Sequence, residues 1–167
     1  MNTHGLTIPL SSSAFAKLSV GDKVLLSGSL FTARDEAHKK LVQYLKEGRD
    51  IGFSLNDSVL FYCGPSPIPA GKICGAVGPT TSARMDKWTP ILLDHGLRVM
   101  LGKGERSTEV VTAIHEHKAL YLTSIGGISA LLSRCIVSCE TFLWPELGPE
   151  AIFKLTVKDF PAYVAIV

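Results

Sequence analysis

At residues 77–86 the chain reads Val77-Gly78-Pro79-Thr80-Thr81-Ser82-Ala83-Arg84-Met85-Asp86: an apolar lead-in, a proline turn, paired hydroxyls and then an arginine. If a helix begins at this turn, Thr80 and Arg84 are four residues apart and lie on one face near its N-terminus. The free N–H groups of a helix N-terminus favour an anion, and the planar guanidinium of Arg84 suits a carboxylate. This stretch therefore predicts an anion pocket with a hydroxyl beside it.

Strand-like and helix-like segments alternate on both sides of this stretch. The expected strands cover residues 23–28, 58–63, 97–101, 119–123, 135–142, 152–157 and 163–167, and the expected helices end near residues 46, 95, 116 and 134. Thr32 with Asp35 three residues later indicates the cap of the first helix, and Pro90 predicts a kink or break in the second, which starts at about Thr81. This alternation predicts an α/β sandwich with a mixed sheet flanked by helices.

Length and composition narrow the class of protein. At 167 residues, one domain (residues 1–167) is the default. A formal charge of +2, without any long run of like charges, argues against binding to nucleic acid. We expect neither a signal peptide nor a membrane span, because the chain opens without a charged segment and an apolar core, and no apolar run approaches about 18 residues. The four cysteines are then expected to be free thiols in a reducing cytoplasm: Cys63, Cys74, Cys135 and Cys139.

Cationic side chains recur at the predicted strand-to-helix junctions. Arg34 follows the first strand, Arg84 follows Thr80 at the second junction, and Lys103 follows the strand over residues 97–101. Ligands of α/β sheets bind where the carboxyl ends of the strands meet, so these junctions are expected to converge at one edge. Three cations there suit a small substrate with two carboxylates. The alternative for each cation is ordinary surface charge.

Four segments together resemble a known family. Gly78–Asp86 resembles the signature of the C-terminal domain, or beta subunit, of class I iron–sulfur fumarases and L-tartrate dehydratases. Gly28–Lys39 is similar to the family's arginine–aspartate–(two residues)–histidine element, and Tyr62-Cys63-Gly64-Pro65 is similar to its tyrosine–x–glycine–proline turn. Gly102-Lys103-Gly104 matches its glycine–lysine–glycine loop. The four segments occur in the family's order between Gly21 and about Gly127, which identifies the family but leaves the substrate open.

The resemblance implies a fold and roles for particular residues. The fold is the swivelling β/β/α architecture. Arg34, Arg84 and Lys103 hold the carboxylates of the substrate, and Thr80 moves the proton at the carbon next to a carboxylate. A threonine hydroxyl needs a lowered pKa for that role, which Arg84 and the expected helix N-terminus would supply. The alternative for Thr80 is a plain helix cap, and one residue can have both roles.

Asp35, His38 and Thr81 are expected in supporting positions beside these residues. Asp35 and His38 are three residues apart on one face of the expected helix, where the aspartate would orient Arg34. The alternative for this pair is an N-terminal helix carboxylate and a partly buried histidine. The other histidines lack partners at metal-binding spacing, so no metal ligand is assigned to this chain.

The cofactor of the family is a four-iron, four-sulfur (4Fe-4S) cluster. The cysteines of this chain have no C-x-x-C spacing, so we interpret them as small buried hydrophobes or free thiols. The resemblance agrees, because it places the cluster ligands on an alpha subunit that is absent from this chain. The expected partners are that alpha subunit, in a hetero-oligomer, and a small dicarboxylate. A homodimer is the expectation for the isolated chain.

We interpret the chain as the beta subunit of a hydro-lyase that adds water reversibly to fumarate, giving malate at an interface with the alpha subunit. An L-tartrate dehydratase beta subunit has the same motifs. A non-catalytic dicarboxylate-binding or regulatory module is the alternative of another class, although the complete set of Arg34, Thr80, Arg84 and Lys103 argues against it. The resemblance also implies a C-terminus longer than one that ends at Val167, with the missing tail at the partner interface.

Overall fold

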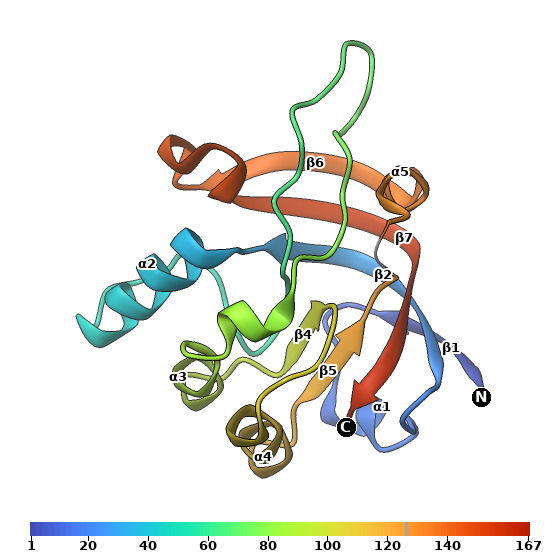
Figure 1. Ribbon diagram of the computed structural model, residues 1–167, viewed down its shortest axis with the longest axis vertical. Coiled ribbons are helices and arrows are strands. Elements are labelled where there is room, and N and C mark those ends of the chain that lie inside the picture. Colours follow the sequence, from blue (N-terminus) through green and yellow to red (C-terminus); the bar gives the residue numbers. More distant parts are fainter. Residues whose placement is uncertain (126) are drawn as a thin grey trace.

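The computed structural model describes residues 1–125 and 127–167, which form one mixed sheet with helices around it (Figure 1). The strands are β1 (Thr3–Thr7), β2 (Lys23–Thr32), β3 (Val59–Phe61), β4 (Val99–Gly102), β5 (Leu120–Thr123), β6 (Ile136–Leu143) and β7 (Ile152–Ile166). The α-helices are α1 (Ser12–Phe15), α2 (Asp35–Lys46), α3 (Thr89–Asp94), α4 (Thr108–Glu116) and α5 (Ser129–Leu132). Three short 3₁₀ helices are η1 (Ser82–Met85), η2 (Ser133–Cys135) and η3 (Pro145–Glu150). The expectation of an α/β fold with a mixed sheet is confirmed.

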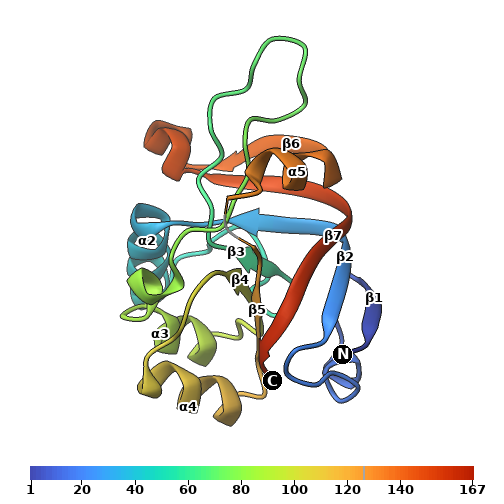
Figure 2. The ribbon, with the colours of Figure 1, turned by 45° about the vertical axis from the view of Figure 1, so that its right-hand side comes forward.

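The sheet closes on itself through β7. Its strand order is β1-β2-β3-β4-β5-β7-β6, and β7 also pairs with β2. Neighbours among β1 to β5 are parallel, whereas β7 is antiparallel to β2, β5 and β6. Because β7 joins β5 to β2, the strands β2, β3, β4, β5 and β7 form a closed circuit, all of which is labelled in Figure 2. The parallel strands β2 to β5 therefore share one carboxyl edge.

Side chains of the parallel strands alternate between two hydrophobic cores. In β3, Val59 and Phe61 face a core enclosed by the strand circuit, whereas Leu60 faces a second core. The second core includes residues of α2, α3 and α4, which cover that side of the sheet (Figure 2). β4 follows the same period of two, with Leu101 in the first core and Met100 in the second. Burial on both faces explains why these strands read as continuous apolar runs in the sequence.

The expected single helix from Thr81 to about residue 95 is wrong. The chain instead forms the four-residue turn η1 and, after residues 86–88, the helix α3. Pro90 lies in the first turn of α3, where its missing N–H leaves no helical hydrogen bond unmade and its fixed φ suits a helix start. The predicted break therefore exists, but it lies ahead of Pro90. Thr80 lies outside η1, so it does not share a helix face with Arg84.

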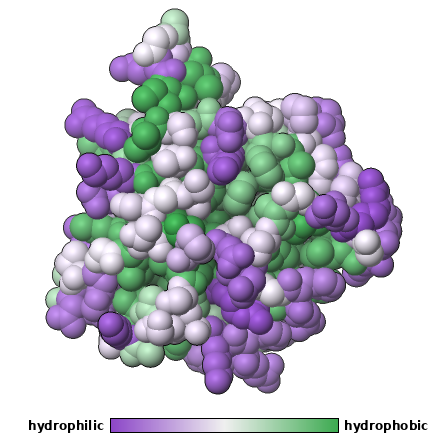
Figure 3. Space-filling view, turned by 180° about the vertical axis from the view of Figure 1, so that it is seen from behind, coloured by the Kyte–Doolittle hydropathy of each residue, from purple (hydrophilic) through white to green (hydrophobic). Residues whose placement is uncertain are grey.

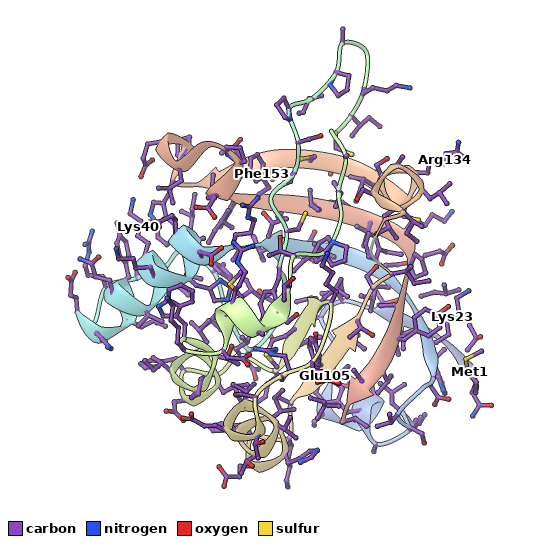
Figure 4. The ribbon with its side chains drawn as sticks, viewed as in Figure 1. Met1, Lys23, Lys40, Glu105, Arg134 and Phe153 are labelled. Carbon is purple, nitrogen blue, oxygen red and sulfur yellow. The ribbon has the colours of Figure 1, made fainter. Side chains whose placement is uncertain are left out.

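Three further details differ from the sequence expectation. The strands over residues 152–157 and 163–167 are one strand, β7, which passes a register shift near Asp159, whose φ is 51°. Strand β1 was not expected. Thr32 does not cap α2: it ends β2, and its hydroxyl accepts a hydrogen bond of 3.0 Å from the Phe153 N–H on β7 (Phe153 is labelled in Figure 4).

Residues 64–78 form a long loop that leaves the sheet after β3 and returns just ahead of η1. Figures 1 and 2 show this loop projecting well beyond the rest of the molecule. In Figure 3 hydrophobic and hydrophilic residues are mixed, both along the projection and over the remainder of that face. Because the loop leaves after β3 and returns ahead of η1, both of its ends lie at the carboxyl edge of the sheet.

Among the described residues, none of the helices is long and apolar enough to cross a bilayer.

Candidate functional site

Backbone contacts at the carboxyl edge bring the predicted junctions together. Beyond the strand ends the ladder continues, with Ala33 N–H donating to the Phe61 carbonyl over 2.8 Å. Thr80 N–H donates to the Tyr62 carbonyl over 2.6 Å, so the segment that holds Thr80 runs along the end of β3. The junctions after β2, β3 and β4 thus lie side by side although they are far apart in the sequence.

Lys103 and the segment at Thr80 are fixed to each other through Ser82. Thr81 and Lys103 form a short parallel bridge. Ser82 N–H donates to the Lys103 carbonyl over 2.9 Å, and Lys103 N–H donates to Ser82 Oγ over 3.0 Å. Thr81 contacts Lys103 through its backbone, and its side chain is exposed. Thr80 is half-buried, and the position that precedes η1 is Thr81 rather than Thr80.

Arg34 lies across the turn that follows β3. A Cβ added to Gly64 would lie 2.6 Å from Arg34 Cδ and 2.9 Å from the Pro149 carbonyl oxygen, so only glycine leaves room for this side chain. Arg34 Nε lies 3.4 Å from Glu150 Oε1, and both side chains are mostly buried. This ion pair lacks hydrogen-bond geometry, and Nε makes no hydrogen bond with a described residue. Arg34 Nε is thus a buried donor without a hydrogen-bond acceptor, and the Glu150 carboxylate is the charge that it faces.

Arg84 forms an ion pair with Asp35 at the start of α2. Its Nη2 and Nε donate to the two carboxylate oxygens, the second over 3.3 Å, which is the bidentate arrangement that guanidinium groups favour. Burial alone would raise the pKa of Asp35, but the hydrogen bond from Arg84 holds it below its ordinary value. We expected Asp35 to orient Arg34, and the structure corrects this: Asp35 binds Arg84, while Arg34 faces Glu150.

The three predicted cations thus differ in their partners. Arg34 and Arg84 each face a carboxylate of this chain. Among the described residues, no acidic group lies within 4 Å of the Lys103 ammonium, although the residue is half-buried. An anion that reaches this edge can therefore bind Lys103 without displacing a carboxylate.

The His38 side chain makes a hydrogen bond to the backbone of Arg34. Its side chain is buried, and Nδ1 donates to the Arg34 carbonyl over 2.8 Å, which leaves Nε2 as the unprotonated nitrogen of the neutral ring. Burial lowers the pKa of His38 to about 4. The ring packs between Tyr62 and Trp88, at centroid distances of 5.2 and 5.7 Å. His38 is therefore fully rather than partly buried, and it supports Arg34 through the main chain.

Sequence reasoning missed four residues that shape this edge. They are Glu150, which faces Arg34, together with Arg106, Asp86 and Tyr121. Arg106 is buried between the tyrosine rings, with Nε donating to Asp86 Oδ1 over 2.7 Å. Asp86 is the last residue of the stretch over residues 77–86, but local spacing did not indicate its partner Arg106, and the other three residues reach the site through tertiary packing.

The site is an open edge rather than a closed pocket. Clefts of about 250 to 630 Å³ open elsewhere on the described surface, beside the projecting loop, α1, α2 and α4, and these are not lined by the four candidate residues: Arg34, Thr80, Arg84 and Lys103. The cleft of about 630 Å³ lies between the projecting loop and α5, with Arg134 at its rim (Figure 4). Enclosure of a small substrate at this edge would need a further protein surface.

The cysteines do not form a cluster site within the described residues. All four are free thiols; Cys63 and Cys74 are buried, and Cys135 and Cys139 pack partly buried against the same core. Burial raises the pKa of the Cys63 thiol to about 12, which disfavours the thiolate that a metal needs. In residues 1–125 and 127–167, no group of three or more His, Cys, Asp or Glu side chains is placed to hold a metal ion.

A match over nearly the whole chain decides the family. The family model described as Fumarase C-terminus covers residues 4–167. This chain belongs to the fumarase C-terminus family. Among its relatives, the "Fumarate hydratase class I, anaerobic" of Escherichia coli (strain K12) is 41% identical over 149 residues, which are 88% of this chain and 27% of that protein. "Fumarate hydratase 2" of Leishmania major is 40% identical over 149 residues, 88% of this chain and 26% of that protein.

Relatives of this family member differ in length. The chain spans about a quarter of the fumarate hydratases. The "Putative L(+)-tartrate dehydratase subunit beta" of Methanocaldococcus jannaschii is 36% identical over 156 residues, which are 90% of this chain and 80% of that protein. The family therefore includes both parts of long chains and a protein of similar size that is described as a subunit.

Proposed function

We propose that this chain is the beta subunit, or C-terminal part, of a class I iron–sulfur hydro-lyase that hydrates fumarate reversibly to malate. The observation that carries the proposal is the edge where Lys103, unpaired among the described residues, lies beside the Thr80–Arg84 segment. The fumarase C-terminus match over residues 4–167 supports it.

In this proposal the cations bind the two carboxylates of the substrate. Lys103 binds a carboxylate directly, and the guanidinium groups of Arg34 and Arg84 exchange Glu150 and Asp35 for substrate oxygens. All three cations then stabilise the negative charge that develops on the carboxylate next to the reacting carbon. Thr80 transfers the proton at that carbon, with the nearby cations favouring its alkoxide form. The four-residue η1 has little helix dipole, so the cations supply this field.

The iron–sulfur cluster is proposed to be bound by the partner alpha subunit. The thiols of this chain do not fit a cluster site, because complete or partial burial raises the pKa of each and keeps it protonated, so no step of the reaction passes through them. The open edge supports a site that the partner completes. We propose that residues 1–167 act as one domain of the swivelling β/β/α type, with the closed strand circuit as its core.

An L-tartrate dehydratase beta subunit is the second candidate. The Methanocaldococcus jannaschii relative, which is described as a putative tartrate dehydratase subunit beta and is 36% identical over 90% of this chain, favours it. L-Tartrate differs from malate by one hydroxyl, and both are dicarboxylates, so the same three cations suit either substrate.

Steady-state kinetics of the chain co-expressed with its genomic neighbour, without oxygen, test the proposal. A kcat/KM for fumarate well above that for L-tartrate supports fumarate hydratase, and the reverse order supports tartrate dehydratase. A cluster-loaded pair that converts neither substrate contradicts the hydro-lyase and favours a dicarboxylate-binding module.

A further inference from the structure

The main chain, not an ion pair, fixes the position of Lys103. Both its N–H and its carbonyl are bound by Ser82, as described above. Ser82 is fully buried and lies directly over Gly102, where an added Cβ would overlap its hydroxyl oxygen and come within 2.8 Å of the Tyr62 ring. Ser82 therefore sets both the spacing and the register between Lys103 and the segment that contains Thr80.

Tyr121 completes a ring of hydrogen bonds around this contact. It lies on β5 opposite Met100, and its hydroxyl oxygen lies 2.8 Å from Ser82 Oγ and 2.7 Å from the Gly104 carbonyl oxygen. A phenol has one proton and a carbonyl can only accept, so Tyr121 donates to Gly104 and the Ser82 hydroxyl donates to Tyr121. Ser82 Oγ still accepts the Lys103 N–H. The ring spans the peptide on each side of Lys103.

The surroundings of Tyr121 keep this ring intact. Tyr121 is almost completely buried, and the guanidinium of Arg106 lies 4.9 Å from the centroid of its aromatic ring. Arg106 is itself held by Asp86 and by Thr89 Oγ1, each over 2.7 Å. Burial raises the pKa of Tyr121 to about 12, so the hydroxyl remains a donor at neutral pH. The phenol is therefore a fixed support and not a titrating group.

We propose that Tyr121, acting with Ser82, is a positioning residue that places the ammonium group of Lys103 beside Thr80 to bind a substrate carboxylate. The inference rests on the proposed function only in giving Lys103 a carboxylate to bind. The carboxylates that face Arg34 and Arg84 hold those side chains in place. For Lys103, the hydrogen bonds of Ser82 and Tyr121 fix the main chain from which its side chain extends.

A double-mutant cycle in the assembled enzyme tests this role. Tyr121→Phe keeps the aromatic side chain but removes its hydroxyl. It should lower kcat/KM for the dicarboxylate about tenfold, mainly through a higher KM. In a Lys103→Ala background the same change should have less than about a twofold effect, because its target is gone. Equal effects in the two backgrounds would show that Tyr121 acts on the fold in general and would overturn the proposal. Tyr44→Phe, whose ring packs on Trp144, is the matched control.

Amide hydrogen exchange of the full chain gives a reading that needs no activity. Tyr121→Phe and Ser82→Ala should each speed exchange at Lys103 about tenfold, while Leu101 within β4 keeps its wild-type rate. Unchanged exchange of the Lys103 amide in both variants would contradict the proposal that the hydrogen bonds of Ser82 and Tyr121 fix the main chain of Lys103. If the wild-type pair converts neither fumarate nor L-tartrate, the proposed function fails, and the exchange rates alone decide whether Tyr121 positions Lys103.

Discussion

Three cations at one sheet edge are held there in two different ways. Arg34 and Arg84 face acids of the same chain, with side chains 29% and 49% exposed, whereas Lys103 is positioned by main-chain hydrogen bonds. The Arg84–Asp35 pair is the more exposed of the two; exposed ion pairs contribute about 0–1 kcal/mol, so a dicarboxylate can replace Asp35 at little cost. We infer that these acids hold the guanidinium groups in place until the substrate binds.

His38 makes folding stability depend on pH. The folded state keeps its imidazole neutral down to about pH 4, whereas the unfolded chain takes up the proton near pH 6.5. The unfolded state therefore binds more protons between these values, and the free energy of unfolding should fall by up to about 1.4 kcal/mol per pH unit as the pH decreases through this window. Chemical denaturation at several pH values between 4 and 7 measures this slope.

His38→Asn separates this effect from other titrations, since asparagine retains a donor for the Arg34 carbonyl but does not titrate. The variant should have a shallower slope between pH 6.5 and 4. His95→Asn is the matched control. Like His38, His95 donates from Nδ1 to the carbonyl four residues earlier, over 2.8 Å, but His95 is exposed. An identical slope in wild type and His38→Asn would show that His38 is not held neutral.

At the scale of elements, the link between η1 and α3 is anchored to the start of α4. The Asp86 carboxylate accepts hydrogen bonds from Arg106 Nε over 2.7 Å and from the Ser107 N–H over 2.8 Å. Ser107 in turn caps α4. This anchor ends η1 after one turn and replaces the continuous helix that the sequence predicted.

Removal of the anchor should destabilise the fold strongly. Asp86→Ala leaves the Arg106 guanidinium, whose side chain is 0% exposed, without its counter-charge, and should lower the free energy of unfolding by about 3–5 kcal/mol. Urea denaturation measures the loss. Glu47→Ala removes an acid from a surface pair with Arg49 and should leave stability close to wild type. A similarly small effect of Asp86→Ala would mean that Arg106 is stabilised mainly by the tyrosine rings.

The local pattern of apolar residues correctly predicted the strands that are buried on both faces. The apolar runs around Leu60 and Met100 gave the buried strands, and the position of Lys103 after a parallel strand placed it correctly at the carboxyl edge. The helix expected from Thr81 to about residue 95 begins near its expected start but ends after one turn, because Asp86 binds Arg106, which lies 20 residues further along the chain. Glu150 was not predicted either, because the fold alone brings it close to Arg34, which is far away in the sequence.

At the scale of the whole molecule, β7 decides the architecture. Its pairing with β2 and β5 closes the sheet, and its N-terminal part also pairs with β6. Pairing over such sequence distances has no local signature, so the sequence predicted a mixed sheet but not its closure. The closed circuit pairs each of β2 to β5 on both sides, and the loops at their carboxyl edge are the surface that we propose a partner completes.

Anaerobic titration of the cluster-bearing partner with this chain, followed by fumarate turnover, tests the central claim most directly. We predict that neither protein alone converts fumarate and that activity rises until the two are equimolar. Thr80→Ala should assemble equally well and keep KM nearly unchanged, but lower kcat by about 10²- to 10⁴-fold, the usual contribution of a proton-transfer group. Full activity of the partner alone, or wild-type turnover by Thr80→Ala, would contradict the account.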